Sequence, residues 1–406
     1  MSRALSLFLS AALALAPLAL DAKPEKKSKK GQPAESSAAA ESTPASESSV
    51  VVFRSKSGNS YGGVRIPAVI TGKNGRLLAF AEGRATAADQ SNNDIILSIS
   101  DDDGKTWSKA DNIAEAGKDC FNNPCPVFDA STGTIFVLFQ KYPDGVSERN
   151  GKLTAGSSGA TVITNWVIES KDNGRSWTKP KDITKTTKPE SAKLIAGGPH
   201  PGVQLTRGAK KGRLVIPYNE APEFGKWSVY AVYSDDHGKT WKSGESAENK
   251  DGVPNETAVA ELSDGDVMIN ARKWTGAGVR KVAVSGNGGT RFRATENDDA
   301  LFCNSTQGAL LRYSFAEDKA SGGKSRLLFS GIGGPKRQDG TVYLSYDEGK
   351  TWAHKRMTIP GYFAYSGLVR LANGDIGLIY EATGHTEIRF ARITLDWLTD
   401  GKDKGK

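Results

Sequence analysis

Three arginines that could bind an anion stand at the ends of short apolar segments or in a turn between them. Arg65 opens one short apolar segment, Arg272 closes another, and Arg337 lies in a polar turn. A guanidinium group stays charged at all working pH values and binds a carboxylate through a planar fork. Taken singly, an arginine at such a position is more often a solvated surface charge. If the fold gathered the three, they would form a site for a small anionic ligand.

Other polar residues stand in comparable positions, at the ends of apolar segments or in the loops beside them. A lone tyrosine usually belongs to a core or a rim, and a lone glutamate is usually solvated. Their value as candidates therefore depends on whether the fold brings them together. The set comprises Arg84, Asp89, Asn123, Glu256, Tyr365 and Glu381.

The elements that must position these residues are repeated along the chain. One is an eight-residue turn of the form Ser-x-Asp-x-Gly-x-Thr/Ser-Trp, in which the Asp accepts backbone N–H groups and the Gly takes positive φ. Its Trp packs under a neighbouring sheet. The turn occurs at Ser100–Trp107, Ser170–Trp177, Ser234–Trp241 and Ser345–Trp352, with a degenerate copy at Ser285–Phe292.

A second repeat consists of a turn residue followed by a short apolar strand, which we call strand B. It occurs at Arg76–Glu82, Thr134–Gln140, Arg213–Tyr218, Asp266–Ala271, Arg326–Ser330 and Asp375–Glu381. Each copy follows another strand-like segment, strand A. These segments are Ile66–Ile70, Pro126–Ala130, Gly202–Thr206, Thr257–Leu262, Ala309–Phe315 and Ser366–Leu371.

Six such units predict an all-β fold, a six-bladed β-propeller of four-stranded antiparallel blades over residues 50–400. The last unit has a third strand, Glu387–Ile393, but little chain left for a fourth. We therefore expect Val50–Arg54 to complete blade six and close the ring, which removes an exposed edge. A β-sandwich or a β-helix would explain the strands but not the six A–B pairs.

Antiparallel connectivity decides which residues share a face of the disc. The start of strand A, the end of strand B and the B–C turn lie on one face, and the Asp-containing C–D turns lie on the other. The polar residues singled out above all belong to the first group. We therefore expect them to meet at the central mouth of one face, where binding sites usually form.

At this point the sequence resembles the bacterial exo-sialidases (neuraminidases) over roughly residues 50–397. The resemblance is carried by the Arg-Ile-Pro tripeptide at Arg65–Pro67, the repeated Asp boxes, the Asn-Glu-Thr segment at Asn255–Thr257, and an arginine triad. Two departures stand out. Asn123 aligns with an Asp in some relatives, and the fourth box has Asn287 and Phe292 in place of Asp and Trp.

The resemblance implies a role for each candidate. Arg65, Arg272 and Arg337 would bind the substrate carboxylate, with Glu381 supporting Arg65. Tyr365 would be the nucleophile, Glu256 its activating base, and Asp89 the acid/base. Arg84 would contact the substrate near its 4-position and acetamido group, and the departure at Asn123 leaves a contact to that region in doubt. No cofactor and no metal are implied.

The implied activity is hydrolysis of terminal α-linked sialic acid with retention, through a covalent sialosyl–tyrosine intermediate. A trans-sialidase or an intramolecular trans-sialidase shares these residues and differs in acceptor-side aromatics. Trp166 and Trp227 are candidates for that role, although Trp more often packs within blades. A non-catalytic sialoglycan-binding propeller would need only the arginines. Linkage preference depends on the loops around Ser147–Ser158 and Phe224–Trp227.

Residues 1–22 resemble a signal peptide, with Arg3 in the charged region, Leu5–Leu20 as the apolar run and Ala22 at a small-residue cleavage site. An uncleaved membrane anchor is the alternative. Residues 23–49 hold almost no large apolar side chains, which predicts a disordered linker. We therefore expect a secreted protein, periplasmic or extracellular, with no stable membrane insertion after cleavage.

The composition of the chain indicates which classes of partner it is expected to bind. The net charge is +8, but Lys and Arg are spread along the chain, which favours an anionic substrate, a sialylated glycan, over nucleic acid. The odd cysteine count argues against a disulfide framework, although a Cys120–Cys125 bridge could form after export. The four His show no metal-ligand spacing. We expect a monomer.

Overall fold

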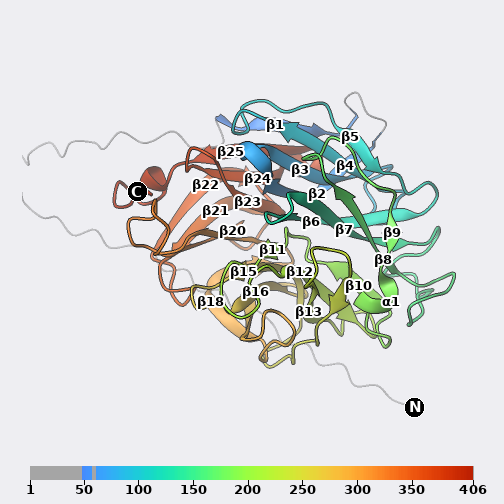
Figure 1. Cartoon of the computed structure of the whole chain (residues 1–406). Coiled ribbons are helices and arrows are strands. Elements are labelled where there is room, and N and C mark those ends of the chain that lie inside the picture. The colour runs from blue at the N-terminus through green and yellow to red at the C-terminus, as the bar shows by residue number, and fades with distance from the viewer. Residues whose placement is uncertain (1–47, 57–60, 406) are drawn as a thin grey trace, which may run out of the picture. The chain divides into compact units, whose positions relative to one another are not determined.

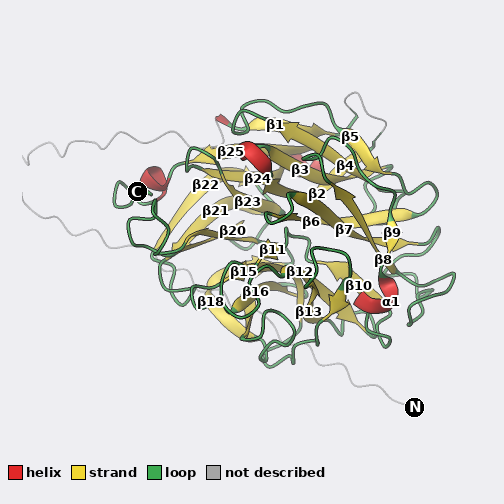
Figure 2. Cartoon of the chain, viewed as in Figure 1, coloured by secondary structure: helices red, strands yellow, loops and turns green. Residues whose placement is uncertain are grey.

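The computed structural model describes residues 48–56 and 61–405 and has six small antiparallel sheets joined by loops, with little helix (Figure 1, Figure 2). The predicted signal peptide at residues 1–22, and the predicted linker up to residue 47, lie outside the described residues. In the described part, no helix is both long and apolar enough to cross a bilayer.

The first three blades run in chain order. Blade one contains β2 (Gly63–Thr71), β3 (Leu77–Arg84), β4 (Asp94–Ser100) and β5 (Asp111–Ala114). Blade two contains β6 (Cys120–Asp129), β7 (Thr134–Tyr142), β8 (Thr164–Ser170) and β9 (Lys181–Asp182). Blade three contains β10 (Leu194–Gly197), β11 (Val203–Gln204), β12 (Leu214–Ala221), β13 (Ser228–Ser234) and β14 (Lys242–Ser243).

The remaining blades complete the ring. Blade four contains β15 (Pro254–Glu261), β16 (Val267–Lys273), β17 (Ala277–Ser285) and β18 (Glu296–Asn304). Blade five contains β19 (Ala309–Ser314), β20 (Arg326–Ile332), β21 (Gln338–Ser345) and β22 (His354–Tyr362). Blade six contains β23 (Ser366–Arg370), β24 (Ile376–Ala382), β25 (Glu387–Ile393) and β1 (Val50–Arg54). The six-bladed propeller is confirmed.

Strand A of blade three differs from the prediction of one strand at Gly202–Thr206. The structure has two short pieces, β10 and β11, which both pair with β12. The segment between them contains Pro199 and Pro201, which have no N–H to donate to a ladder. The strand is interrupted for that reason.

Ring closure by the N-terminal strand is confirmed. β1 pairs antiparallel with β25, with Val50 opposite Phe390. Described residues on either side of residues 50–400 also pack against the propeller. Ser49, expected in the linker, is buried, and its hydroxyl contacts Tyr380. Asp403, beyond the predicted end at residue 400, is buried in a bidentate ion pair with Arg326.

The closing strand offers a stability test. The side chain of Phe53 is only 2% exposed, so Phe53→Ala should lower the free energy of unfolding by about 3 kcal/mol, as large-to-small core changes do. The neighbouring Arg54→Ala removes an exposed ion pair with Glu387 and should cost under about 1 kcal/mol. Urea unfolding of both variants checks this, and equal losses would contradict the role of β1 as a packed strand.

The Asp boxes form the predicted C–D turns. In the first, a carboxylate oxygen of Asp102 accepts the backbone N–H groups of Lys105 and Thr106, and Gly104 has φ of +77°. The box tryptophans pack between blades. Trp107 lies against Phe390 of blade six, with ring centroids 5.2 Å apart. The boxes therefore fasten neighbouring blades, and none of their Asp residues lines the central pocket described below.

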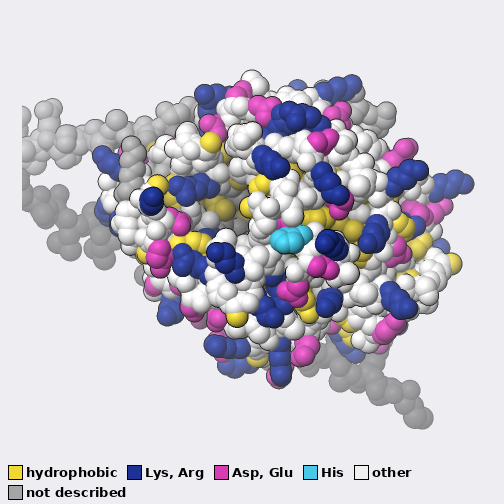
Figure 3. Space-filling model, in the orientation of Figure 1, with side chains coloured by type: hydrophobic (Ala, Val, Ile, Leu, Met, Phe, Trp, Pro, Cys, Tyr) yellow, Lys and Arg dark blue, Asp and Glu magenta, His cyan; other side chains and the backbone are white. Residues whose placement is uncertain are grey.

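Surface charge is mixed. On the face seen in Figure 3, Lys and Arg side chains lie interspersed with Asp and Glu, without one continuous positive band. A positive band along one surface is what nucleic-acid binding usually requires. On this face, therefore, no such band accompanies the net charge of +8.

Candidate active site

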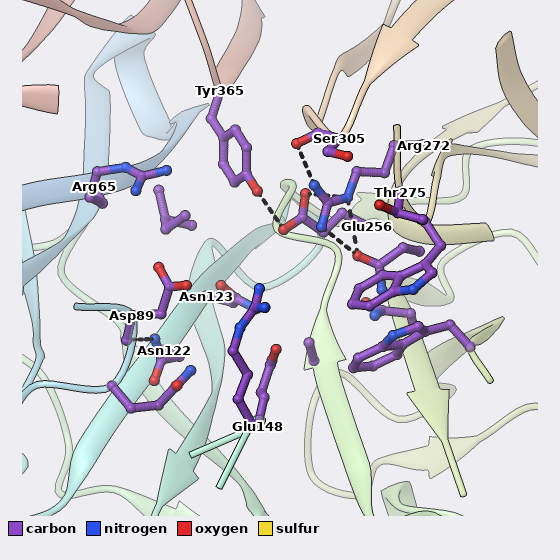
Figure 4. Close-up of a pocket in the computed structure, with 18 of the residues that line it drawn as sticks. Arg65, Asp89, Asn122, Asn123, Glu148, Glu256, Arg272, Thr275, Ser305 and Tyr365 are labelled. Atoms are coloured by element: carbon purple, nitrogen blue, oxygen red, sulfur yellow. Dashed lines mark hydrogen bonds and ion pairs between the residues drawn. The ribbon is translucent and has the colours of Figure 1, made fainter. Parts of the chain in front are cut away.

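A cavity of about 450 Å³ is lined by the polar residues at the strand ends, which were predicted to meet on one face of the disc. Eight of the nine sequence-predicted residues line it, and the ninth, Glu381, lies directly behind Arg65. Figure 4 shows Arg65, Asp89, Glu256, Arg272 and Tyr365 around it. The lining members of the predicted set are Arg65, Arg84, Asp89, Asn123, Glu256, Arg272, Arg337 and Tyr365.

Irregularities in the first strand of blades one and two direct side chains into the pocket. The pairing register shifts between Arg65 and Ala68 in β2, and between Asn122 and Cys125 in β6. Ile66 has φ of +59°, a costly conformation for a β-branched residue. A bulge of this kind bends a strand and redirects its side chains. The strain in β2 is therefore found beside the arginine that faces the pocket.

Buried carboxylates hold these bulges. Glu381 Oε1 accepts hydrogen bonds from the Ile66 N–H at 3.0 Å and from Arg65 Nε at 2.6 Å. Glu82 Oε1 accepts from the N–H of Asn123 at 2.7 Å. Both carboxylates are fully buried and lie near the end of strand B of their blades. Each thus fixes the start of strand A in the next blade around the ring.

Glu82 was missed by the sequence analysis. It contacts Arg84 twice, with Arg84 Nη2 at 2.6 Å from Glu82 Oε2 and Arg84 Nε at 2.7 Å. A signal was present, because Glu82 and Glu381 are the final residues of two matching strand B repeats. Comparing the repeats position by position would have found it.

The charges around Glu381 determine its state. Burial alone would raise its pKa, but the charge of Arg65 and the hydrogen bonds from His385 and Arg65 outweigh burial. The pKa of Glu381 therefore lies well below its usual range, and the carboxylate stays ionised beside Arg65.

A backbone carbonyl joins the other two arginines. Arg337 Nη2 donates to the Ser305 oxygen at 2.9 Å, and Arg272 Nη1 donates to the same oxygen. Arg280, which is buried, donates to the carbonyl of the adjacent Thr306 at 3.1 Å. The spacing of two pocket guanidinium groups is thus set by one loop. Sequence reasoning could not find Ser305, because its main chain and not its side chain makes these contacts.

Tyr365 and Glu256 form the centre of the pocket. The Tyr365 hydroxyl donates to Glu256 Oε1 at 2.6 Å, and Glu256 Oε2 lies 3.1 Å from Arg272 Nε. The guanidinium carbons of Arg65 and Arg337 lie 5.4 and 5.5 Å from the centre of the Tyr365 ring. Figure 4 shows the hydroxyl directed at Glu256, with Arg65 and Arg272 on opposite sides.

The resting tyrosine is protonated. Burial and the charge of Glu256 raise its pKa, and the charges of Arg272, Arg337 and Arg65 lower it without cancelling that rise. The three arginines therefore favour the phenolate, but burial and Glu256 outweigh them in the free protein.

Asp89 is held ionised in the free protein. Its Oδ1 lies 2.8 Å from Arg84 Nη1, and its side chain is 62% exposed within the pocket mouth. Partial burial raises its pKa, but the charge and hydrogen bond of Arg84, with the charge of Arg65, lower it further. An acid role, which requires the protonated form, would therefore depend on substrate binding or on low pH.

The remaining predictions have mixed outcomes. Trp227 lines the pocket but is only 1% exposed and packs on Trp274, whereas Trp166 does not line it and stacks with Lys141.

Cys120 and Cys125 are both free thiols, so the bridge that we left open is absent. Burial raises the pKa of each thiol to about 12.

Glu148 is a further pocket residue that the sequence analysis did not name. It lies in the B–C loop of blade two, and its Oε1 accepts a hydrogen bond from the Tyr142 hydroxyl at 3.0 Å. Burial raises the pKa of Glu148, and the charges of Asp89 and Glu256 add to the rise. Its loop belongs to the face that connectivity had singled out, but a single Glu in a polar loop gave no further signal.

Comparisons of sequence agree with this geometry. The profile of the BNR repeat-like domain matches residues 75–378. The chain is 35% identical over 352 residues to the sialidase of Micromonospora viridifaciens, covering 82% of this chain and 52% of that protein. It is 30% identical over 360 residues to sialidase-2 of Mus musculus, covering 82% and 92%. The chain thus spans about half the length of the bacterial relative.

Solved structures share the architecture. The Hadza microbial sialidase Hz136 matches with a TM-score of 0.77 at 26% identity, covering 86% of this chain and 69% of that chain. The intramolecular trans-sialidase from Ruminococcus gnavus matches with a TM-score of 0.74 at 18% identity, covering 87% and 99%. At 18% identity, the likeness extends to the fold alone.

Proposed function

This chain belongs to the family of BNR-repeat sialidases, and from that premise we propose that it is a retaining exo-α-sialidase acting on terminal α-linked sialic acid of glycans. The observation that carries the proposal is the 2.6 Å hydrogen bond from Tyr365 to Glu256 in a pocket lined by three arginines. A pocket that only bound sialoglycans would need the arginines but no tyrosine hydrogen-bonded to a glutamate.

Arg65, Arg272 and Arg337 would bind the substrate carboxylate. Their guanidinium groups come from blades one, four and five and border one cavity. Three cations close together repel, and here Glu381 and Glu256 offset part of that charge through contacts at 2.6 and 3.1 Å. The remaining positive charge can be satisfied by one anionic ligand.

Tyr365 would attack the anomeric carbon. A carboxylate nucleophile would be repelled by the substrate's own carboxylate, which is attached to that carbon, whereas tyrosine is neutral at rest. As the Tyr365 oxygen forms its bond to carbon, its proton passes to Glu256 Oε1. The glycosidic C–O bond breaks in the same step, which leaves the sugar covalently attached to Tyr365.

Asp89 would serve both half-reactions. It gives a proton to the departing glycosidic oxygen and then removes one from the water that releases the sugar from Tyr365. That water attacks from the side that the leaving group has vacated, so the configuration at the anomeric carbon is retained. Tyr365 recovers its proton from Glu256.

Incubation with a fluorogenic aryl α-sialoside tests the proposal. We expect release of the fluorophore, with NMR showing the α-anomer of free sialic acid as the first product. A β-anomer formed first would contradict retention. The product mass separates hydrolysis from intramolecular transfer, since an anhydro sugar is lighter by one water. A chain that binds the sialoside without cleaving it would be a lectin-like propeller.

The pH dependence gives a second test. Because only protonated Asp89 can donate, kcat/KM should fall as pH rises through its lowered pKa. Arg84→Lys keeps the charge but cannot contact Glu82 and Asp89 at once, so the pKa of Asp89 should rise. The falling limb should then move to higher pH by about half a unit, as expected for a lost contact worth under 1 kcal/mol. An unmoved limb would show that Arg84 does not control Asp89.

A further inference from the structure

Two loops meet at the rim of the pocket and present a cation on an aromatic surface. The loops are residues 143–163 of blade two and 222–227 of blade three. The guanidinium carbon of Arg149 lies 5.3 Å from the centre of the Phe224 ring, and that ring meets Trp274 edge-on, 5.1 Å between centroids. All three residues line the pocket, and Phe224 is 43% exposed.

The guanidinium group of Arg149 makes no direct polar contact with the described part of the protein. Among the described residues it has no ion pair and no hydrogen bond, only its contact with Phe224. Two carboxylates that line the same pocket have other partners: Asp89 pairs with Arg84, and Glu148 accepts a hydrogen bond from Tyr142. A guanidinium group stacked on a ring keeps its N–H edges free for an acceptor in its own plane. Arg149 can therefore still bind an anion.

Arg149 borders the cavity that also holds Asp89, the residue that would protonate the departing oxygen. Arg149 and Asp89 line the same cavity, and the charge of Arg149 also contributes to lowering the pKa of Asp89. In Figure 4, Asp89 and Glu148 lie on the side of the pocket opposite to Arg272 and Ser305. The triad would bind the carboxylate of the terminal sugar, so this cation is left for another group.

We propose that Arg149 and Phe224 form a leaving-group subsite for an acidic sugar. The face of the departing ring would pack on Phe224, and its carboxylate would bind the fork of Arg149. The substrate class favoured by this subsite is a glycan in which the terminal sialic acid is linked α2,8 to a second sialic acid. The inference rests on the proposed function, because Asp89 marks the departing oxygen only if the chain is a sialidase.

Arg149→Gln tests the subsite on three substrates: an α2,8-linked disialyl-lactose, 3′-sialyllactose and an aryl α-sialoside. We expect kcat/KM for the disialyl substrate to fall about tenfold more than for the other two, the loss typical of one charge-assisted contact at a wet rim. Arg149→Lys, which keeps the charge and loses the fork, should retain part of the preference. Lys152→Gln is the matched control, since Lys152 is on the same loop but does not line the pocket.

The outcomes separate the two proposals. An equal fall on all three substrates would mean that Arg149 contacts the terminal sugar, and this would overturn the leaving-group subsite alone. A Lys152→Gln variant with the same selective loss would overturn it as well, because the effect would then be long-range charge. Wild-type protein inactive on the aryl sialoside would overturn the proposed sialidase function and this inference with it.

Discussion

Tyr365→Phe should reduce turnover of an aryl sialoside by about three orders of magnitude or more, as loss of a catalytic nucleophile generally does. The change removes one oxygen and its 2.6 Å hydrogen bond to Glu256 and leaves the ring in place. The ring is 5% exposed and flanked by Arg65 and Arg337, so the pocket shape should persist. Steady-state kinetics and the melting temperature, measured on the same sample, separate lost chemistry from lost folding.

The matched variant for this prediction is Glu256→Gln. Its amide can still accept the Tyr365 hydrogen bond but cannot take the proton, so the variant should lose most of kcat while Tyr365 stays in position. Substrate binding, measured with a sialic acid analogue, should remain in Tyr365→Phe because the three arginines are unchanged. Near-normal turnover by Tyr365→Phe would defeat the covalent mechanism, whatever the binding result.

The fold could be read from the sequence because its repeats are local. Each Asp box is closed by bonds within about eight residues, as in the contacts of Asp102 with Lys105 and Thr106. The pairing of β1 with β25 is not local, but the last unit lacked a strand and the first residues supplied an unassigned one. Strand A of blade three was predicted as one strand because the two prolines that split it lie just before the predicted segment.

The sequence predicted those parts of the site in which side chains make the contacts. It did not predict the contacts made by the backbone. Arg65 and Tyr365 stand at strand ends that connectivity assigns to one face, and the family resemblance gave them roles. The carbonyl of Ser305 gave no signal, since any residue supplies a carbonyl oxygen. The lowered pKa of Asp89 also escaped prediction, because it depends on a contact with Arg84 that only folded coordinates reveal.

Glu381→Gln should damage both binding and stability. The carboxylate is fully buried and accepts hydrogen bonds from Arg65, the Ile66 N–H and His385. An amide offers one oxygen and turns an N–H toward another donor, so Arg65 loses its charge partner and its fixed position. Breaking a buried pair in this way costs about 3 kcal/mol in the free energy of unfolding. A misplaced Arg65 should also lower kcat/KM by roughly a hundredfold.

A control separates this effect from ordinary ion-pair loss. Glu387→Gln removes a carboxylate that pairs with Arg54 and Arg389 outside the pocket, so it should leave kcat/KM near the wild-type value. If both variants lost activity equally, general destabilisation and not the position of Arg65 would be the cause. Activity should therefore be measured well below the melting temperature of the weaker variant.

The pH dependence of stability tests whether the charge of Glu381 causes the stability difference between the wild type and Glu381→Gln. Since the pKa of Glu381 is lowered in the folded protein, its stabilisation is complete above the ordinary glutamate pKa of about 4.3 and is lost as pH falls toward the folded value. The wild type and Glu381→Gln should thus differ most in free energy of unfolding at neutral pH and converge in acid. Urea unfolding at pH 7 and at roughly pH 3 compares the full difference with one that has begun to shrink. A difference that stayed constant between them would mean that Glu381 acts through its shape, and the triad would then not depend on its charge.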